Sequence, residues 1–193
     1  MKKNIIITFS ISIIINFLII LLSSTIAGAG AVERDELRVN AGLDYFQSIL
    51  TADLDIAEKK GDDGFLTLLL IYTDNRPQAE KMTRIISSLK EIKDIPIRVE
   101  ITNDLTLSSF KDKPPAGIFI TQPLENKLPD VVDYAVKNSI VLFSPFKGDV
   151  EKGVLGGIHI SAKVRPYINL SAMKASKVRI TKIFISVSET YAP

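Results

Sequence analysis

Three nearly continuous stretches of hydrophobic residues, each closed by polar turn residues, predict buried β-strands. They cover residues 65–72, 116–120 and 140–143. Short apolar runs without alternation are typical of strands covered on both faces, as in a parallel sheet. A fourth stretch, residues 95–101, has isoleucine or valine at every second position and predicts a more exposed strand.

Helical spacing separates these strands. Apolar residues recur every three or four positions over 33–50, 77–93 and 128–137. Asp74 or Asn75 is expected to cap the second helix, with Pro77 near its first turn. Its charged end, residues 90–94, is interpreted as a solvated helix face. Alternating strands and helices predict crossover units and a parallel sheet.

The pattern changes after Gly148. Residues 154–160 and 163–170 predict two strands joined at residues 161–162, and residues 171–177 predict a short helix. Residues 182–188 fit a helix or a strand equally well, because their apolar residues alternate and are β-branched. We therefore expect one α/β domain with a mostly parallel sheet flanked by helices and an antiparallel edge near the C-terminus.

The first 31 residues form a separate segment. Lys2 and Lys3 precede a long apolar run that ends in small residues, including Ala29 and Ala31. This order is typical of a signal peptide, with cleavage after either alanine. The run is also long enough to remain as an uncleaved membrane anchor. Both alternatives place a domain over 32–193 outside the cytoplasm, in the periplasm, either free or tethered to the inner membrane.

Composition narrows the chemistry of this domain. The chain has no cysteine and one histidine, His159, which removes thiolate catalysis, most zinc sites and most hydrolase triads. Without Lys2 and Lys3, the 22 remaining basic residues balance 22 acidic ones, and no basic cluster indicates a nucleic-acid partner. We expect a non-enzymatic protein with no catalytic residue, no metal and no cofactor, which acts on a protein or a small molecule.

Polar residues follow the predicted strands directly, and these are the candidate ligand-binding residues. In open α/β sheets, ligands bind outside the carboxyl ends of the strands, at the point where the strand order reverses. The same residue types also cap helices and close turns, and that alternative stays open. The candidates are Thr73, Asp74, Asn75, Thr121, Gln122 and Ser144.

The C-terminal third carries a motif of paired glycines in an apolar strand, followed by a strand that ends in Ile-Asn and by an alanine-bearing helix. Its residues are Gly156, Gly157, Ile158, Ile168 and Asn169. The glycines suit either a close backbone approach at a binding surface or a bulge or tight strand crossing, and Asn169 is expected to cap the helix.

This motif resembles the C-terminal part of YfiR-type periplasmic proteins, although the chain lacks the cysteines and the Trp-Pro step common in that family. The resemblance implies a regulator that represses an inner-membrane signalling protein, such as a diguanylate cyclase or a histidine kinase, and that forms homo-oligomers, typically homodimers. The alternative, from the strand-end residues, is the small-molecule-binding component of an extracytoplasmic uptake or sensing system.

Overall fold

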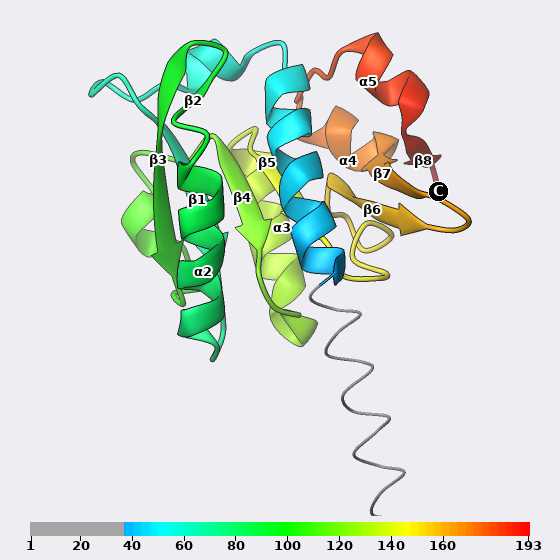
Figure 1. The fold of residues 1–193 in the computed structure, drawn as a ribbon, viewed down its shortest axis with the longest axis horizontal. Helices are drawn as coiled ribbons and strands as arrows, with labels where there is room; N and C mark the ends of the chain where they lie inside the picture. Colours follow the sequence, from blue (N-terminus) through cyan, green and yellow to red (C-terminus); the bar gives the residue numbers. More distant parts are fainter. Residues whose placement is uncertain (1–36) are drawn as a thin grey trace, which may run out of the picture. The chain divides into compact units, whose positions relative to one another are not determined.

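The computed structural model describes residues 37–193, so the expectations for residues 1–31 lie outside the described part. Within it, no helix combines the length and the apolar character needed to cross a bilayer. Figure 1 shows a central sheet with helices on both faces. The predicted α/β class is confirmed.

The sheet has eight strands in the order β2-β3-β1-β4-β5-β6-β7-β8. Strands β3, β1, β4, β5 and β6 are parallel, β6 and β7 form the predicted antiparallel pair, and β8 runs parallel to β7 at the edge. The strands are β1 Leu66–Ile71, β2 Glu91–Ile92, β3 Ile95–Thr102, β4 Gly117–Ile120, β5 Val141–Ser144, β6 Gly156–Ile160, β7 Val164–Asn169 and β8 Glu189–Tyr191.

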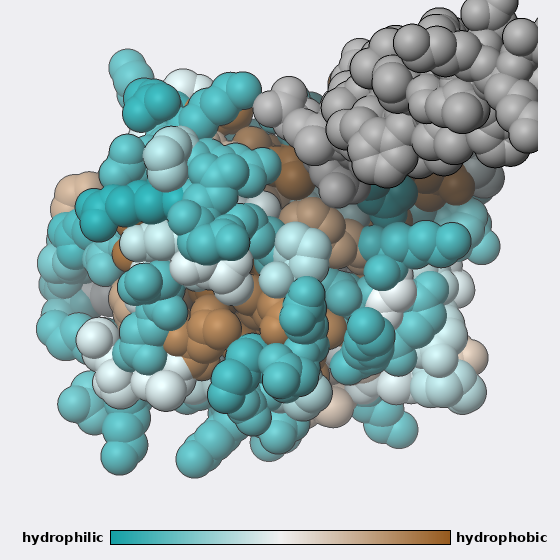
Figure 2. Space-filling model, turned by 90° about the horizontal axis from the view of Figure 1, so that it is seen from below, coloured by the Kyte–Doolittle hydropathy of each residue, from teal (hydrophilic) through white to brown (hydrophobic). Residues whose placement is uncertain are grey.

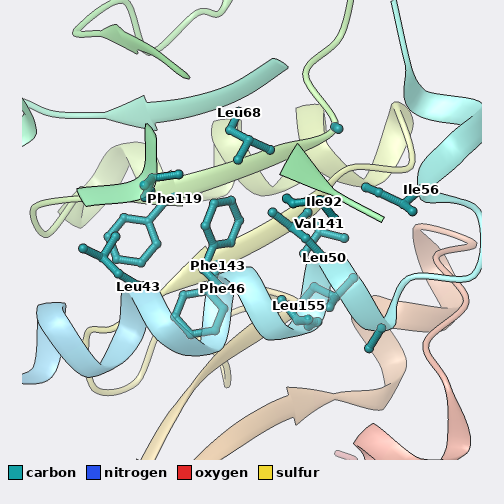
Figure 3. Close-up of a cluster of buried hydrophobic side chains, with 14 of the residues drawn as sticks. Leu43, Phe46, Leu50, Ile56, Leu68, Ile92, Phe119, Val141, Phe143 and Leu155 are labelled. Carbon is teal, nitrogen blue, oxygen red and sulfur yellow. The ribbon is translucent and has the colours of Figure 1, made fainter. Parts of the chain in front are cut away.

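Alternate residues of the buried strands face two separate hydrophobic layers. On one face, Phe119 and Phe143 pack with Phe46 of the helix over residues 37–52 and with residues of α2 (Arg76–Ser87). On the other face, Ile118 and Leu142 pack under α3 (Leu128–Lys137). Figure 3 shows the first layer, in which Phe46 lies over Phe119 and Phe143. Burial on both faces explains why these strands are nearly continuous apolar runs.

The order in which the chain adds strands to the sheet reverses between β1 and β4. After β1 the chain crosses through α2 to β3 on one side, and then returns to β4 on the other side of β1. The carboxyl ends of β1 and β4 therefore flank the topological switch point, where open sheets of this type bind ligands. We call this end of the parallel strands the carboxyl edge and the opposite end the amino edge.

The second helix is shorter than its pattern predicts. It ends at Ser87, and residues 90–94 form the turn and short strand that lead into β3 instead of a solvated helix end. Lys93 Nζ donates to the backbone oxygen of Asp53 at 2.8 Å, and Ile92 is buried. Lys90, Lys93 and Asp94 have positive φ, which lies outside the α-helical region, and the contact of Lys93 with a segment distant in the sequence outweighs local helix propensity.

The ambiguous segment near the C-terminus is helical. It forms α5 (Lys182–Val187) after α4 (Leu170–Ala175), and β8 follows it. The backbone N–H of Thr181 donates to Ala52 O at 3.0 Å, which ties the start of α5 to the end of the 37–52 helix. Short 3₁₀ turns complete the fold: η1 (Ile56–Lys59), η2 (Ser108–Phe110) and η3 (Glu125–Lys127).

Candidate functional site

Four of the six candidate residues meet at the switch point. Gln122, just after β4, extends its side chain to the loop between β1 and α2. Its Oε1 accepts hydrogen bonds from the backbone N–H groups of Thr73 at 2.9 Å, Asp74 at 3.2 Å and Asn75 at 3.0 Å. Its Nε2 donates to Asp74 Oδ1. The Gln122 amide therefore occupies a nest of three N–H donors and contacts a carboxylate at the same time.

The N-terminus of α2 adds to this polar arrangement. Of the two predicted caps, Asp74 and Asn75, the structure has Asn75 as the N-cap of α2. Its Oδ1 accepts a hydrogen bond from Gln78 N at 3.1 Å. The unsatisfied N–H groups and the dipole at a helix N-terminus favour negatively charged groups. Asp74 supplies a carboxylate beside them, so the switch point offers partners for both an anionic and a cationic group.

The other two candidates have structural partners. Thr121 is almost fully buried, and its hydroxyl donates to Ile71 O at 2.7 Å, which links β4 to β1. Ser144, at the end of β5, is fully buried and donates to Asp149 Oδ2 at 2.6 Å. Among the described residues, no hydrogen bond connects Ser144 to the cluster around Gln122.

The buried pair of Ser144 and Asp149 gives a prediction on pH. Burial raises the pKa of Asp149 above its ordinary value near 3.8, and this outweighs the hydrogen bond from Ser144. A carboxyl group whose pKa is higher in the folded state favours folding when protonated. That contribution is full below the unfolded pKa and is lost as pH rises through the folded pKa. An uncharged asparagine keeps an acceptor for Ser144 and avoids the loss.

We therefore expect Asp149→Asn to become more stable relative to the unsubstituted protein as pH rises from about 4 to about 7. Urea denaturation of both proteins across this range measures the difference. A stability difference that does not change with pH would contradict the raised pKa.

The motif residues are assembled on one strand pair and serve the fold. Gly156 lies opposite Ile168, and Gly157 lies opposite Tyr167, in the β6–β7 ladder. A Cβ on Gly157 would lie 2.6 Å from Val150 Cγ2 and 2.8 Å from Ser144 O. The close approach of β5 and the loop that follows it therefore requires this glycine. The predicted cap is confirmed: Asn169 Oδ1 accepts from Ala172 N at 2.8 Å. Ile158 is buried in the core.

The carboxyl edge combines polar and apolar surface. Figure 2 views the domain from this side and shows hydrophobic side chains gathered near the centre with hydrophilic ones around them. The partly buried Phe146 follows β5 at this edge, whereas Leu124, which follows β4, is buried in the core. Small-molecule sites combine an apolar lining with a few convergent polar groups in a concave pocket; polar and apolar groups meet at this edge, and the two cavities described below lie at the opposite end of the strands.

A second feature, which the sequence did not indicate, is a hollow of about 520 Å³ at the amino edge. Its wall comes from the loop before β1, from β3, and from the segments that precede β4 and β5. A smaller hollow of about 270 Å³ shares Glu58, Lys59 and Asn138 with it. The loop segments alone have the composition of ordinary solvated turns, so only the fold shows that they border one space together with β3.

Among the described residues, no group of three or more histidine, aspartate or glutamate side chains is arranged so that it could hold a metal ion. Asp63 forms an ion pair with Arg98, whose Nη1 lies 2.6 Å from Asp63 Oδ2, and the Arg98 guanidinium also lies 4.7 Å from the centre of the Phe65 ring.

Comparison with known proteins identifies the fold. No family model matches the sequence, and no curated protein matches it. One similar solved structure is an "ABC domain in complex with L-Trp" from Streptococcus pneumoniae, with a TM-score of 0.52 and 11% identity over 77% of this chain. Another is a conserved domain protein from Vibrio cholerae O1 biovar El Tor, with a TM-score of 0.52 and 10% identity over 79% of this chain.

The present chain covers 60% and 59% of those two chains, which is less than two thirds of their length. At such low identity the similarity concerns the fold alone. The domain therefore shares its α/β architecture with these two proteins.

Proposed function

We propose that this protein is a non-enzymatic, extracytoplasmic binding protein for a small zwitterion of the α-amino-acid type, in an uptake or sensing system. The observation that carries the proposal is the position of the Gln122 amide at the switch point. One oxygen accepts from three backbone N–H groups, and the adjoining NH₂ donates to Asp74.

This hydrogen-bond pattern matches the head group of an amino acid. A carboxylate accepts from N–H donors as the Gln122 oxygen does, and more strongly, because charge-assisted hydrogen bonds are the stronger ones. An ammonium group donates to Asp74 as the Gln122 NH₂ does, and its charge likewise makes this hydrogen bond stronger. In the proposed bound state, Gln122 turns aside and the ligand head takes its place, between the N-terminus of α2 and the Asp74 carboxylate.

The apolar centre of the carboxyl edge supports a ligand with a hydrophobic side chain (Figure 2). The structural neighbour from Streptococcus pneumoniae is described as a complex with L-Trp, which makes L-tryptophan the first probe. Burial of an indole ring contributes binding free energy in proportion to the apolar area removed from water, while the head group fixes the orientation.

A thermal-shift series tests the head group. The domain is melted with each standard L-amino acid, then with tryptamine, which lacks the carboxylate, and with indole-3-propionate, which lacks the ammonium. Ligand that binds only the folded state raises Tm. We expect at least one apolar amino acid to raise Tm and both analogues to lose most of the effect. The absence of a shift with any amino acid, or equal shifts with the analogues, would contradict the proposal.

The variant Gln122→Ala tests the mechanism. It removes the Gln122 side-chain amide, which competes with the ligand for the three N–H groups. We therefore expect the dissociation constant for the amino acid to fall several-fold. Gln47→Ala, on the 37–52 helix away from the switch point, is the matched control and leaves affinity unchanged. Weaker binding by Gln122→Ala would show that Gln122 is itself a ligand contact.

A second candidate function is the YfiR-type regulator that the motif suggests, acting on a membrane cyclase or kinase as a homo-oligomer. In its favour, all five motif residues belong to β6, β7 and the cap of α4. The neighbouring α5 exposes Ile183 and Val187, at 80% and 59%, as a surface for protein contact. Capture of a membrane cyclase or kinase by the domain, lost in Ile183→Asp but not in Leu89→Asp, supports this candidate; no such capture argues against it.

A further inference from the structure

We infer that the end of the sheet formed by β6, β7, α4 and α5 is a docking surface for a lipid bilayer that contains anionic phospholipid. Figure 1 shows these four elements together, on the opposite side of the sheet from α2 and β3. We call the exposed side of residues 153–188, which form them, the C-terminal surface. The switch point lies between β1 and β4, so this surface is a separate feature.

The charge of this surface has one sign. Residues 153–188 contain six basic residues and no acidic one, whereas the rest of the described chain has 15 basic and 19 acidic residues. All six basic side chains are exposed: Lys163, Arg165, Lys174, Lys177, Arg179 and Lys182. Arg179 Nε donates to Asp55 Oδ2 at 2.7 Å. The other five cations take part in no ion pair within residues 37–193.

The fold brings these cations onto adjoining elements, although they form no run in the sequence. Lys163 and Arg165 lie at the turn end of the β6–β7 hairpin. Strand β7 leads directly into α4, which has Lys174 in its last turn. Strand β8 pairs with β7, so α5, which begins at Lys182 and ends just before β8, packs against both strands.

Exposed apolar side chains occur on the same elements. Ile160 and Val164 lie directly opposite each other near the hairpin turn and are 46% and 42% exposed. Ile183 and Val187, the most exposed apolar residues of α5, are four positions apart and therefore share one face of that helix. These are four of the eight exposed large hydrophobic residues in the described chain. Phe184 packs against the core, which fixes α5 from its other side.

Anionic lipid fits this combination of groups. Clusters of lysine and arginine are attracted to anionic head groups, and apolar side chains beside them enter the boundary between head groups and acyl chains. A soluble nucleic acid would use only the charges, since proteins that bind single strands stack the bases on aromatic rings. The most exposed apolar residues here, Ile183 and Val187, have no ring.

Vesicle co-sedimentation tests the C-terminal surface. The protein used is the form expected after cleavage at Ala31, because residues 38–193 form one compact unit. We expect it to bind vesicles of phosphatidylglycerol and phosphatidylcholine in equal parts at least about tenfold more tightly than vesicles of phosphatidylcholine alone. Added salt is expected to weaken the binding, because ions screen the attraction. No binding to the anionic vesicles, or equal binding to both kinds, would overturn the inference.

A pair of double variants tests the position of the charges. Lys163→Gln/Lys182→Gln removes one cation from the hairpin turn and one from α5, and we expect a partition constant at least about fivefold lower. Lys81→Gln/Lys137→Gln removes two exposed cations from α2 and α3 and is expected to retain the binding. Equal weakening in both would show attraction by net charge alone and would contradict a defined surface.

The apolar contribution is tested without a change of charge. Ile183→Ser is expected to lower the partition constant at least about threefold, because less apolar area enters the bilayer. Leu89→Ser, at an exposed apolar residue just after α2, is the matched control and is expected to have no effect. Unchanged binding by Ile183→Ser would leave only charge attraction and would overturn insertion at α5.

Two other partners are distinguished by the same variants. Oligouridine RNA that binds as tightly as the anionic vesicles would indicate a general affinity for polyanions and would overturn the inference. Binding to native membranes but not to protein-free vesicles would indicate a protein receptor, with the same consequence. The test is independent of the proposed amino-acid site: Gln122→Ala leaves vesicle binding unchanged, and Lys163→Gln/Lys182→Gln leaves the amino-acid thermal shift unchanged.

Discussion

Phe119→Ala is expected to lower the free energy of unfolding by about 4 kcal/mol, the largest effect of any substitution considered for this domain. Phe119 is fully buried in β4. Its ring centre lies 5.5 Å from that of Phe46 and 5.7 Å from that of Phe143. Alanine would remove the contacts with both rings and leave a cavity between the 37–52 helix and the middle of the sheet.

Urea or guanidinium denaturation measures this loss. Phe65→Ala is the matched control, because Phe65 is only partly buried and lies against the exposed Arg98; a loss of about 1 kcal/mol or less is expected there. Similar losses for the two substitutions would show that the three phenylalanine rings do not form the centre of the core.

Gly157→Ala is expected to cost roughly 2–3 kcal/mol, the second largest effect. The added methyl group would meet Val150 Cγ2 at 2.6 Å and, more seriously, the backbone oxygen of Ser144 at 2.8 Å. A backbone atom of β5 cannot rotate away as a side chain can. The parallel pairing of β5 with β6 must therefore shift, and with it the loop that holds Asp149.

The neighbouring glycine provides the comparison. A Cβ on Gly156 would meet only side-chain atoms, Phe143 Cδ2 at 3.0 Å and Ile49 Cδ1 at 3.1 Å, so Gly156→Ala is expected to cost less than Gly157→Ala. Chemical denaturation of the two variants gives the order directly. The reverse order would mean that the second glycine of the motif is retained for something other than close packing.

The hydrophobic pattern was sufficient to predict most of the sheet. Its central strands are buried on both faces, so they consist almost entirely of apolar residues. The pattern failed where distant contacts decide the structure. Residues 90–94 continue a helical pattern, yet Lys93 reaches Asp53 and the chain turns into β2 and β3. Strand β8 has three residues, too few to produce a periodic signal.

The candidate site was predictable in position and less so in detail. The rule for strand carboxyl ends led to Asp74 and Gln122, since these follow β1 and β4 directly. It could not show that the Gln122 amide fills the nest, because that contact joins residues 48 positions apart. The same rule included Ser144, whose hydroxyl is directed to Asp149 by the loop after β5. The hollow at the amino edge follows no strand end and had no sequence signal.

The most direct test of the account is a backbone amide NMR titration with the amino acid that gives the largest thermal shift. Ligand carboxylate in place of the Gln122 oxygen changes the hydrogen bonds of three N–H groups at once. We expect the largest shifts at Thr73, Asp74 and Asn75, together with a shift of the Gln122 side-chain amide as it leaves the nest. Saturation of the protein with these four signals unmoved would contradict binding at the switch point.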